Sequence, residues 1–377
     1  MSKTYTLRDL LDKGLVPADQ EAALLKVAER FSVALSTPLM EAIEAAQDQN
    51  LDLQQDLSPD PNHHSSHQPN PMAQQFIPNP AELEIKAEEL KEPLGEDHLS
   101  PVKGIVHRYP DRCLLMPLMV CPAYCRFCFR REKVSKKNQS LKPEELKVAI
   151  AYIQSHPEIW EVILTGGEPL MLKARALGAI IAALNAIEHV AVIRIHTRMP
   201  VVDPASVTQE LVQALDSPKA VYVVLHANHP SELTSDTRAA CARFISAGIP
   251  MLSQTVLLKG INDDPQIMGA LMRALVCSRI KPYYLHHAEL AEGTSHFRTS
   301  VQKGQKLMQS LRGHYSGLCQ PSYVLDIPGG YGKVPIHKSY LSSHITAQEH
   351  GKDYLIEDYQ GKQHCYRCTA EDEHIVN

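Results

Sequence analysis

The sequence of 377 residues lacks the features that define several large classes of protein. Its nine cysteines are too few for a disulfide scaffold in so long a chain, which indicates a reducing compartment. No stretch approaches the roughly 20 apolar residues of a membrane-spanning helix, and the N-terminal segment has no apolar core of a secretory signal. A net charge of -5 provides no basic surface for nucleic acid. We therefore expect a soluble, cytoplasmic protein that binds neither membrane nor nucleic acid.

Composition and apolar spacing divide the chain into five regions. Residues 1–55 show helical apolar spacing and predict a helical region. Residues 56–81 begin with a stretch rich in Pro, Asn, His and Ser, which predicts a flexible linker. Residues 82–318 form the predicted core, residues 319–340 a segment that carries Lys333, and residues 341–377 a polar tail. We expect the tail to be irregular and to pack over the core or into an oligomer contact.

Strand-like and helix-like segments alternate six times through the predicted core, which favours a parallel sheet with outer helices. The strand candidates are Cys113–Val120, Trp160–Thr165, Val190–His196, Ala220–His226, Met251–Leu257 and Pro282–His286. The helix candidates are 143–155, 173–188, 205–215, 231–247, 264–277 and 300–312. A partial (βα)6 barrel fits this pattern, and a doubly wound open sheet is the alternative. In a barrel the chemistry gathers at the carboxyl ends of the strands, where the cysteine motif, 166–169, His226 and His286 fall.

Three cysteines lie close together just after the first predicted strand, at Cys121, Cys125 and Cys128. Three thiolates can hold three irons of a cubane cluster, and a fully ligated cluster uses four. The fourth iron would then be open to a small molecule. A structural zinc site and three unrelated core cysteines are the alternatives, but zinc usually takes a fourth ligand at a regular spacing. No clear local partner is present.

Two glycine-rich segments follow predicted strands. Gly166, Gly167 and Glu168 combine glycines that permit close backbone approach with a carboxylate that can accept hydrogen bonds from an ammonium group. Lys333 follows Gly329, Gly330 and Gly332, and a lysine on such a loop can serve as a Schiff-base nucleophile. A phosphate-binding turn would look similar, but the G-x4-G-K-[ST] pattern is absent.

The cysteine motif and the 166–169 segment resemble the radical S-adenosylmethionine superfamily, and the lysine segment makes the chain similar to the lysine 2,3-aminomutase family. The resemblance runs from about residue 104 to about residue 338, through matching stretches at 107–112, 194–198, 228–230, 254–258, 282–284 and 296–298. It implies a partial barrel, a [4Fe–4S] cluster on the three cysteines, S-adenosylmethionine on the open iron, and pyridoxal 5′-phosphate on Lys333. It also implies an exchange of the 2-amino group and a 3-hydrogen of an amino acid.

The resemblance assigns further roles residue by residue. It implies that the cofactor phosphate is held by Arg108 and Arg112, and that Tyr109 packs near the cofactor. It implies that S-adenosylmethionine is contacted by Gly166, Gly167, Glu168, His226 and Gln254. The alternatives are structural roles: solvated surface residues for the two arginines, a turn for 166–169, and a histidine satisfied at a strand end for His226.

The same resemblance implies that three charged residues determine which substrate binds. Arg130 matches the residue that binds the substrate α-carboxylate, and its alternative is a solvated basic pair with Arg131. Glu289 and Asp326 match two carboxylates that receive the distal ammonium of lysine. The family's usual residue at position 289 is aspartate, so the carboxylate arm is longer here. A buried cation needs such partners, which favours a basic amino acid and disfavours glutamate.

The tail contains Cys365 and Cys368, which could hold zinc together with His364 or Asp264, or could be free thiols. Neither a zinc site nor free thiols is favoured over the other, and zinc is not among the predicted cofactors.

These observations predict an isomerase that converts L-lysine to β-lysine. The alternatives are ornithine or arginine as substrate, a relative that makes β-lysine for modification of elongation factor P, and a non-catalytic iron–sulfur sensor. A flavodoxin-like or ferredoxin-like electron donor and a homo-oligomer are the expected partners.

Overall fold

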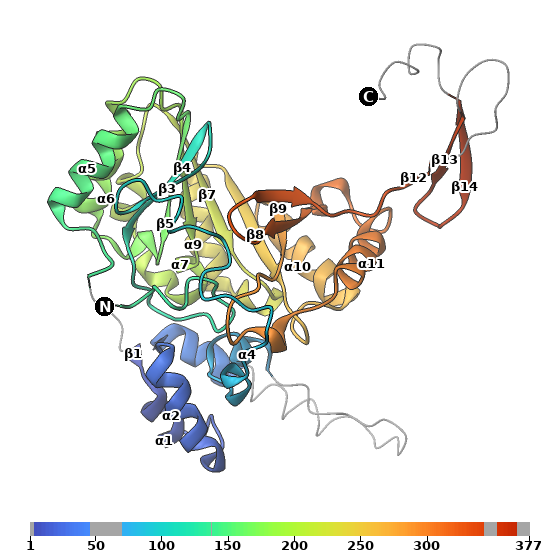
Figure 1. Ribbon diagram of the computed structural model, residues 1–377, viewed down its shortest axis with the longest axis horizontal. Helices are drawn as coiled ribbons and strands as arrows, with labels where there is room; N and C mark the ends of the chain where they lie inside the picture. Colours follow the sequence, from blue (N-terminus) through green and yellow to red (C-terminus); the bar gives the residue numbers. More distant parts are fainter. Residues whose placement is uncertain (1–3, 46–69, 137, 343–352, 368–377) are drawn as a thin grey trace.

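The computed structural model describes residues 4–45, 70–136, 138–342 and 353–367 (Figure 1). Its centre is a nine-stranded sheet in which β4 to β10 run parallel, while β3 and β11 pair antiparallel at the two edges. The strands are β3 (Ile105–Tyr109), β4 (Arg112–Leu118), β5 (Glu161–Gly166), β6 (Val192–Thr197), β7 (Ala220–His226), β8 (Met251–Leu257), β9 (Ile280–His287), β10 (Ser322–Ile327) and β11 (Gly332–Pro335).

The order of the strands decides between the two predicted folds. From β3 to β11 the spatial order follows the chain order without a reversal, whereas a doubly wound sheet reverses its order at a switch point. The prediction of a partial barrel is therefore confirmed. The six predicted strands correspond to β4 to β9, and the structure adds β3, β10 and β11, which the helix–strand alternation did not indicate.

Helices lie outside the sheet between successive strands (Figure 1). They are α5 (Pro143–Gln154), α6 (Ala174–Asn185), α7 (Met199–Val202), α8 (Gln209–Gln213), α9 (Ser235–Ser246), α10 (Pro265–Cys277) and α11 (Val301–Leu311). Five predicted helices agree within a few residues. The sixth, 205–215, is shorter because Pro204–Ser206 forms a 3₁₀ turn and Thr208 caps α8 through the N–H of Leu211. None of the helices among the described residues has the length and apolarity to cross a membrane.

Side chains join the two edges of the sheet where no ladder of backbone hydrogen bonds exists. The Tyr109 hydroxyl on β3 accepts a hydrogen bond from the Lys333 N–H on β11, at 2.7 Å. Arg108 Nη1 on β3 lies 3.0 Å from Asp326 Oδ1 on β10. These contacts close the open side of the barrel and bring residues 108 and 109 beside the lysine segment.

The N-terminal region contains α1 (Leu7–Asp12), α2 (Glu21–Arg30) and the short pair β1 (Thr4–Tyr5) and β2 (Leu35–Ser36). The predicted linker, 56–81, is wrong at its C-terminal end. There α4 (Pro71–Phe76) and the 3₁₀ turn η2 (Pro80–Leu83) form, because Asn70 caps α4 and Met72 and Phe76 are buried. Residues 56–69 of this stretch, and residues 46–55 of the predicted helical region, lie outside the described residues.

The expectation of an irregular tail is also wrong. β12 (Leu341–Ser342), β13 (Asp353–Glu357) and β14 (Gln363–Arg367) form a small antiparallel sheet that projects from the barrel (Figure 1). A turn at Gly361, which has φ of 82°, lets β13 and β14 pair in a hairpin. Lys338 Nζ, 2.6 Å from Glu357 Oε1, and the ring contact between His314 and Tyr359 connect the sheet to the barrel.

Candidate active site

A cavity of about 650 Å³ lies inside the barrel. Its wall is built by residues from β3 to β11 and by the loops that follow β4 and β5. Every residue that the sequence assigned to the cluster, the cofactors or the substrate lines it: Arg108, Arg112, Cys121, Cys125, Cys128, Arg130, Gly166, Gly167, Glu168, His226, Gln254, Glu289, Asp326 and Lys333. The fold therefore brings together residues that are more than 200 positions apart in the chain.

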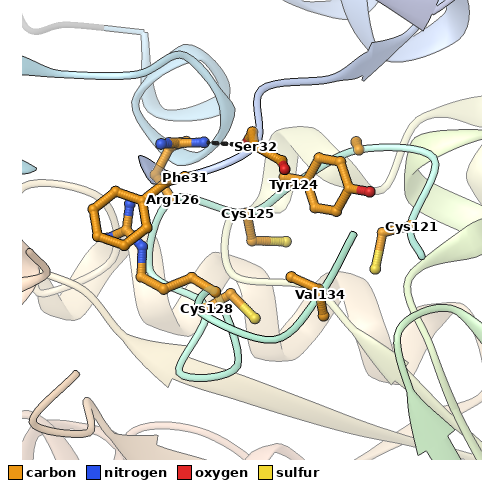
Figure 2. A pocket seen from close by; sticks show the side chains of 10 residues that line it. Phe31, Ser32, Cys121, Tyr124, Cys125, Arg126, Cys128 and Val134 are labelled. Atoms are coloured by element: carbon orange, nitrogen blue, oxygen red, sulfur yellow. Dashed lines mark hydrogen bonds between the residues drawn. The ribbon is translucent and has the colours of Figure 1, made fainter. Parts of the chain in front are cut away.

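The cysteine loop, residues 121–131, follows β4 and forms one wall. Figure 2 shows Cys121, Cys125 and Cys128 around a hollow that Phe31 and Ser32 of the N-terminal region also line. Burial raises the pKa of the Cys128 thiol to about 11 and raises the pKa of the Cys121 thiol well above its ordinary value, so a metal's positive charge is needed to hold them as thiolates.

The sulfurs of the three cysteines are not gathered as closely as ligands around a single metal ion. Among the described residues, one trio of possible ligands has atoms within 4.8 Å of one another, and it contains no cysteine. Sulfurs that share one zinc ion would be about 4 Å apart, because each Zn–S bond is about 2.3 Å long. The three cysteines therefore suit several irons, as in a [4Fe–4S] cluster.

Arg198 connects the cysteine loop to the next strands, a role that the sequence did not reveal. Its Nη1 donates a hydrogen bond to Cys125 Sγ at 2.8 Å. Its Nη2 is fixed by Glu232 Oε2 at 2.7 Å and by Gln75 Oε1 at 2.5 Å. A buried guanidinium thus supplies positive charge beside one cluster ligand. The signal available in the sequence was the 194–198 stretch, which matched the family but received no role.

Two buried acids that precede β3 in the chain, Glu82 and Glu96, pair with the arginines of the cysteine loop. Glu82 accepts from Arg126 Nε at 3.0 Å and Nη2 at 2.6 Å, and it also pairs with Arg131. Arg130 pairs with Glu96. The carboxylate oxygens of Glu96 lie 2.9 Å from Arg130 Nε and 2.5 Å from Arg130 Nη2. Glu82 and Glu96 were both missed. Their only sequence signal was an acid-rich stretch that precedes an arginine-rich one.

The glycines at 166 and 167 pack closely against the end of β4, just before the cysteine loop. The N–H of Gly167 donates to Leu118 O at 2.8 Å, and a Cβ on Gly167 would lie 2.4 Å from Val120 O. The Glu168 carboxylate accepts from Thr197 Oγ1 and from the N–H groups of residues 170 and 198. Burial raises the pKa of Glu168 to about 7. The structure therefore gives these residues partners within the protein, and their contact with S-adenosylmethionine stays a prediction.

Lys333 lies on β11, opposite the cysteine loop. Its ammonium is 2.7 Å from Asp326 Oδ2, and Arg108 takes the other oxygen of that carboxylate. Arg112 does not share Asp326 with Arg108. It pairs with Asp111, and its guanidinium carbon lies 3.9 Å from the centroid of the Tyr109 ring. The predicted phosphate-binding arginines thus have partners of their own in this ligand-free structure.

Two carboxylates meet in the wall beside Lys333. Atoms of His286, Glu289 and Asp326 lie within 4.8 Å of one another. Burial, reinforced by the negative charge of Asp326, raises the pKa of Glu289 to about 7. Burial, reinforced by Lys333, lowers the pKa of His286 to about 3, so this ring is neutral at pH 7. Two carboxyl groups beside a neutral histidine would be stabilised by a bound cation.

His226 and Gln254 are register partners on β7 and β8 and face the cavity. His226 Nε2 lies 3.2 Å from Asn228 Oδ1, and its ring lies 5.6 Å from that of Phe127. Burial lowers the pKa of His226 to about 3. The side chain is therefore a neutral hydrogen-bonding group next to the cysteine loop.

The tail offers no complete metal site among the described residues. Cys368 lies outside them, and Cys365 is exposed. His364 Nε2 lies 2.7 Å from Asp358 Oδ2, while Asp264 caps α10 through the N–H groups of residues 266 and 267. Zinc at Cys365 and Cys368 stays the alternative that the sequence offers.

Comparison with known proteins places this site in a family. The model of the radical SAM superfamily matches residues 116–269, and the model described as lysine-2,3-aminomutase matches residues 308–371. The chain is 43% identical over 274 residues to the L-lysine 2,3-aminomutase of Methanococcus maripaludis, covering 73% of this chain and 63% of that one.

Two further relatives bear on the substrate. The L-lysine 2,3-aminomutase of Clostridium subterminale is 42% identical over 292 residues, covering 78% of this chain and 69% of that one. A glutamate 2,3-aminomutase of Clostridioides difficile is 38% identical over 287 residues, covering 76% of this chain and 66% of that one. The chain thus spans about two thirds of the length of the curated relatives it matches. It belongs to the lysine 2,3-aminomutase family of the radical SAM superfamily.

Proposed function

We propose that this protein is an isomerase that moves the amino group of L-lysine from C2 to C3. The observation that carries the proposal is the pair of half-buried Glu289 and buried Asp326, in one cavity with three cysteines, Arg130 and Lys333. A substrate with a cationic end and a carboxylate end matches these two poles of charge.

The residues present fit the family's cofactors. Three thiols in one wall of the cavity, with Arg198 beside one of them, suit the [4Fe–4S] cluster, and Lys333 with the basic pair Arg108 and Arg112 suits pyridoxal phosphate. When bound, the cluster with S-adenosylmethionine supplies radical chemistry, and pyridoxal phosphate supplies imine chemistry on the substrate nitrogen.

The chain's own residues would orient the substrate. Arg130 holds the α-carboxylate through its free N–H groups, while Glu289 and Asp326 receive the distal ammonium. In this structure the Lys333 ammonium pairs with Asp326 Oδ2, so there is space for a cation beside that oxygen. The buried wall excludes water, and fixing both ends of the substrate places C2 and C3 between the two halves of the cavity.

The pair of acids also separates the candidate substrates. L-Glutamate would bring a carboxylate next to Glu289 and Asp326, and two like charges in a buried site repel. Ornithine and arginine carry a distal cation and remain alternatives, because the carboxylate arm of Glu289 is longer than the family's aspartate. Supply of β-lysine for elongation factor P uses the same chemistry and stays a second proposal. A flavodoxin-like or ferredoxin-like donor would provide the electron, and we expect a homo-oligomer.

The test is anaerobic incubation of purified protein, loaded with cluster and pyridoxal phosphate, with S-adenosylmethionine, a reductant and separate L-amino acids. The panel contains lysine, ornithine, arginine and glutamate, and β-amino products are measured by mass spectrometry. We expect β-lysine as the dominant product. A β-amino product from glutamate alone, or none from any basic amino acid, would overturn the proposal.

A further inference from the structure

A short irregular segment before β3, residues 93–96, contacts three separate parts of the cavity wall. Its first contact is with the lysine loop, residues 328–333. The N–H of Gly329 donates to Pro93 O at 2.9 Å. Gly95 lies so close to this loop that a Cβ added to it would be 2.7 Å from both the carbonyl carbon and the oxygen of Gly329. The two backbones are therefore in direct contact, with no space for a side chain between them.

The same segment holds one arginine through its backbone. Arg108 Nη2 donates to Leu94 O at 2.9 Å while Nη1 of the same side chain binds Asp326. Leu94 and Glu96 both line the cavity. Residues 93–96 thus lie between the lysine loop and the arginine that reaches the acid pair.

The third contact orients Arg130. Glu96, which is 3% exposed, binds the Nε and Nη2 edge of the guanidinium in a bidentate pair. Nη1 points to Thr165 Oγ1 at 3.4 Å, which is a weak contact at the limit of hydrogen bonding. The edge formed by Nη1 and the remaining N–H of Nη2 is therefore left for another acceptor in the cavity.

We propose that residues 93–96 are a positioning element that sets the lysine loop and Arg130 at a fixed distance from each other. Gly95 seats the loop that carries Lys333, and Glu96 turns the free edge of Arg130 to the substrate. The part concerning Arg130 rests on the proposed function, since it requires a substrate carboxylate. The part concerning the lysine loop requires only that Lys333 binds pyridoxal phosphate.

The first experiment separates steric contact from backbone strain. Gly95→Ala places a methyl group against Gly329, and Gly248→Ala is the matched control. Both glycines have positive φ, 62° and 79°, but no atom lies within 4 Å of a Cβ at Gly248. We expect about tenfold weaker binding of pyridoxal phosphate in Gly95→Ala, a difference of about 1.4 kcal/mol, with an unchanged iron content. Equal binding in the two variants would overturn the role of Gly95.

The second experiment tests Glu96 by the affinity for L-lysine, measured from the change in the absorbance of bound pyridoxal phosphate. Glu96→Gln should bind L-lysine about tenfold more weakly with unchanged pyridoxal phosphate affinity, and Glu96→Asp should recover part of the loss. Glu92→Gln is the control, because Glu92 pairs with Lys133 and does not line the cavity.

The outcomes are separable. Unchanged or tighter L-lysine binding in Glu96→Gln would overturn the role of Glu96 while leaving the proposed function intact. If the unmodified protein showed no spectral change with L-lysine, the proposed function itself would fail, and with it the role of Glu96. The Gly95 comparison would still decide whether this segment seats the lysine loop.

Discussion

The two walls of the cavity are held in place by different interactions. On the cysteine loop, Arg126, Arg130 and Arg131 are 1%, 9% and 5% exposed, and each is paired with a buried glutamate. On the lysine loop, three glycines with positive φ form the turn, and Tyr331 is 81% exposed. Its connections to the rest of the protein include backbone hydrogen bonds to Pro93 and to the Tyr109 hydroxyl.

This difference indicates what each wall tolerates. Buried ion pairs are costly to break, because the partner left behind is an uncompensated charge. The cysteine loop should therefore be sensitive to changes of charge at positions that are distant in sequence. A loop built on left-handed glycines should be sensitive to added side chains instead, because L-residues rarely adopt that conformation. The following predictions test this contrast.

The largest expected effect concerns the wall that contains the lysine loop. Lys333→Ala should abolish the absorbance of lysine-bound pyridoxal phosphate and all turnover, since no other lysine among the described residues lines the cavity. The iron content and the cluster spectrum should stay unchanged, because Lys333 makes its ion pair with Asp326 and not with the cysteine loop. Retention of the pyridoxal band in this variant would show that another residue carries the cofactor.

Glu82→Gln should damage the opposite wall. Removal of this charge leaves Arg126 and Arg131 buried without their carboxylate, which should cost about 3–5 kcal/mol of the free energy of unfolding. Denaturant unfolding measures the loss, and iron content should fall with it. Glu84→Gln is the control, because Glu84 is on the surface and pairs with exposed Lys86. A similar small loss in both variants would contradict the contrast between the walls.

A smaller effect is expected at Arg198. Its positive charge and its hydrogen bond to Cys125 Sγ would stabilise the reduced form of a cluster bound there, since hydrogen bonds to the sulfurs raise the reduction potential. Arg198→Leu should shift the potential to more negative values, and Arg198→Lys should shift it less because the charge is retained. Redox titration followed by electron paramagnetic resonance measures both. An unchanged potential in Arg198→Leu would mean that the contact does not persist around the cluster.

The smallest effect concerns Glu289 and pH. Burial raises its pKa to about 7, so between its ordinary pKa of 4.5 and about 7 the folded protein keeps a proton that the unfolded chain releases. The contribution of Glu289 to stability is therefore fully present below pH 4.5 and is lost as the pH rises to about 7. In the ligand-free protein, Glu289→Gln should gain stability relative to wild type between pH 5 and pH 8. If the variant and the wild-type protein differed in stability by the same amount at pH 5 and at pH 8, the raised pKa of Glu289 would be contradicted.

The local pattern of the sequence predicted the barrel for a physical reason. Largely buried strands, such as Glu161–Gly166 and Ala220–His226, contain apolar runs, and the helices between them show apolar residues with a different period. The alternation did not indicate β3 or β11, because these edge strands pair antiparallel outside the repeating unit. The helix after Asn70 was hidden by its position next to a Pro-rich stretch.

The sequence by itself determined the kinds of reactive group: three closely spaced thiols, a lysine among glycines, and acids near predicted strand ends. Only the tertiary structure decided which charges pair, because Glu82 meets Arg126 and Glu96 meets Arg130 across 44 and 34 residues. An ion pair depends on distance in space, and no periodicity in the sequence encodes it. The same reason explains why the contact between Gly95 and Gly329 was visible only after the barrel had brought its two edges together.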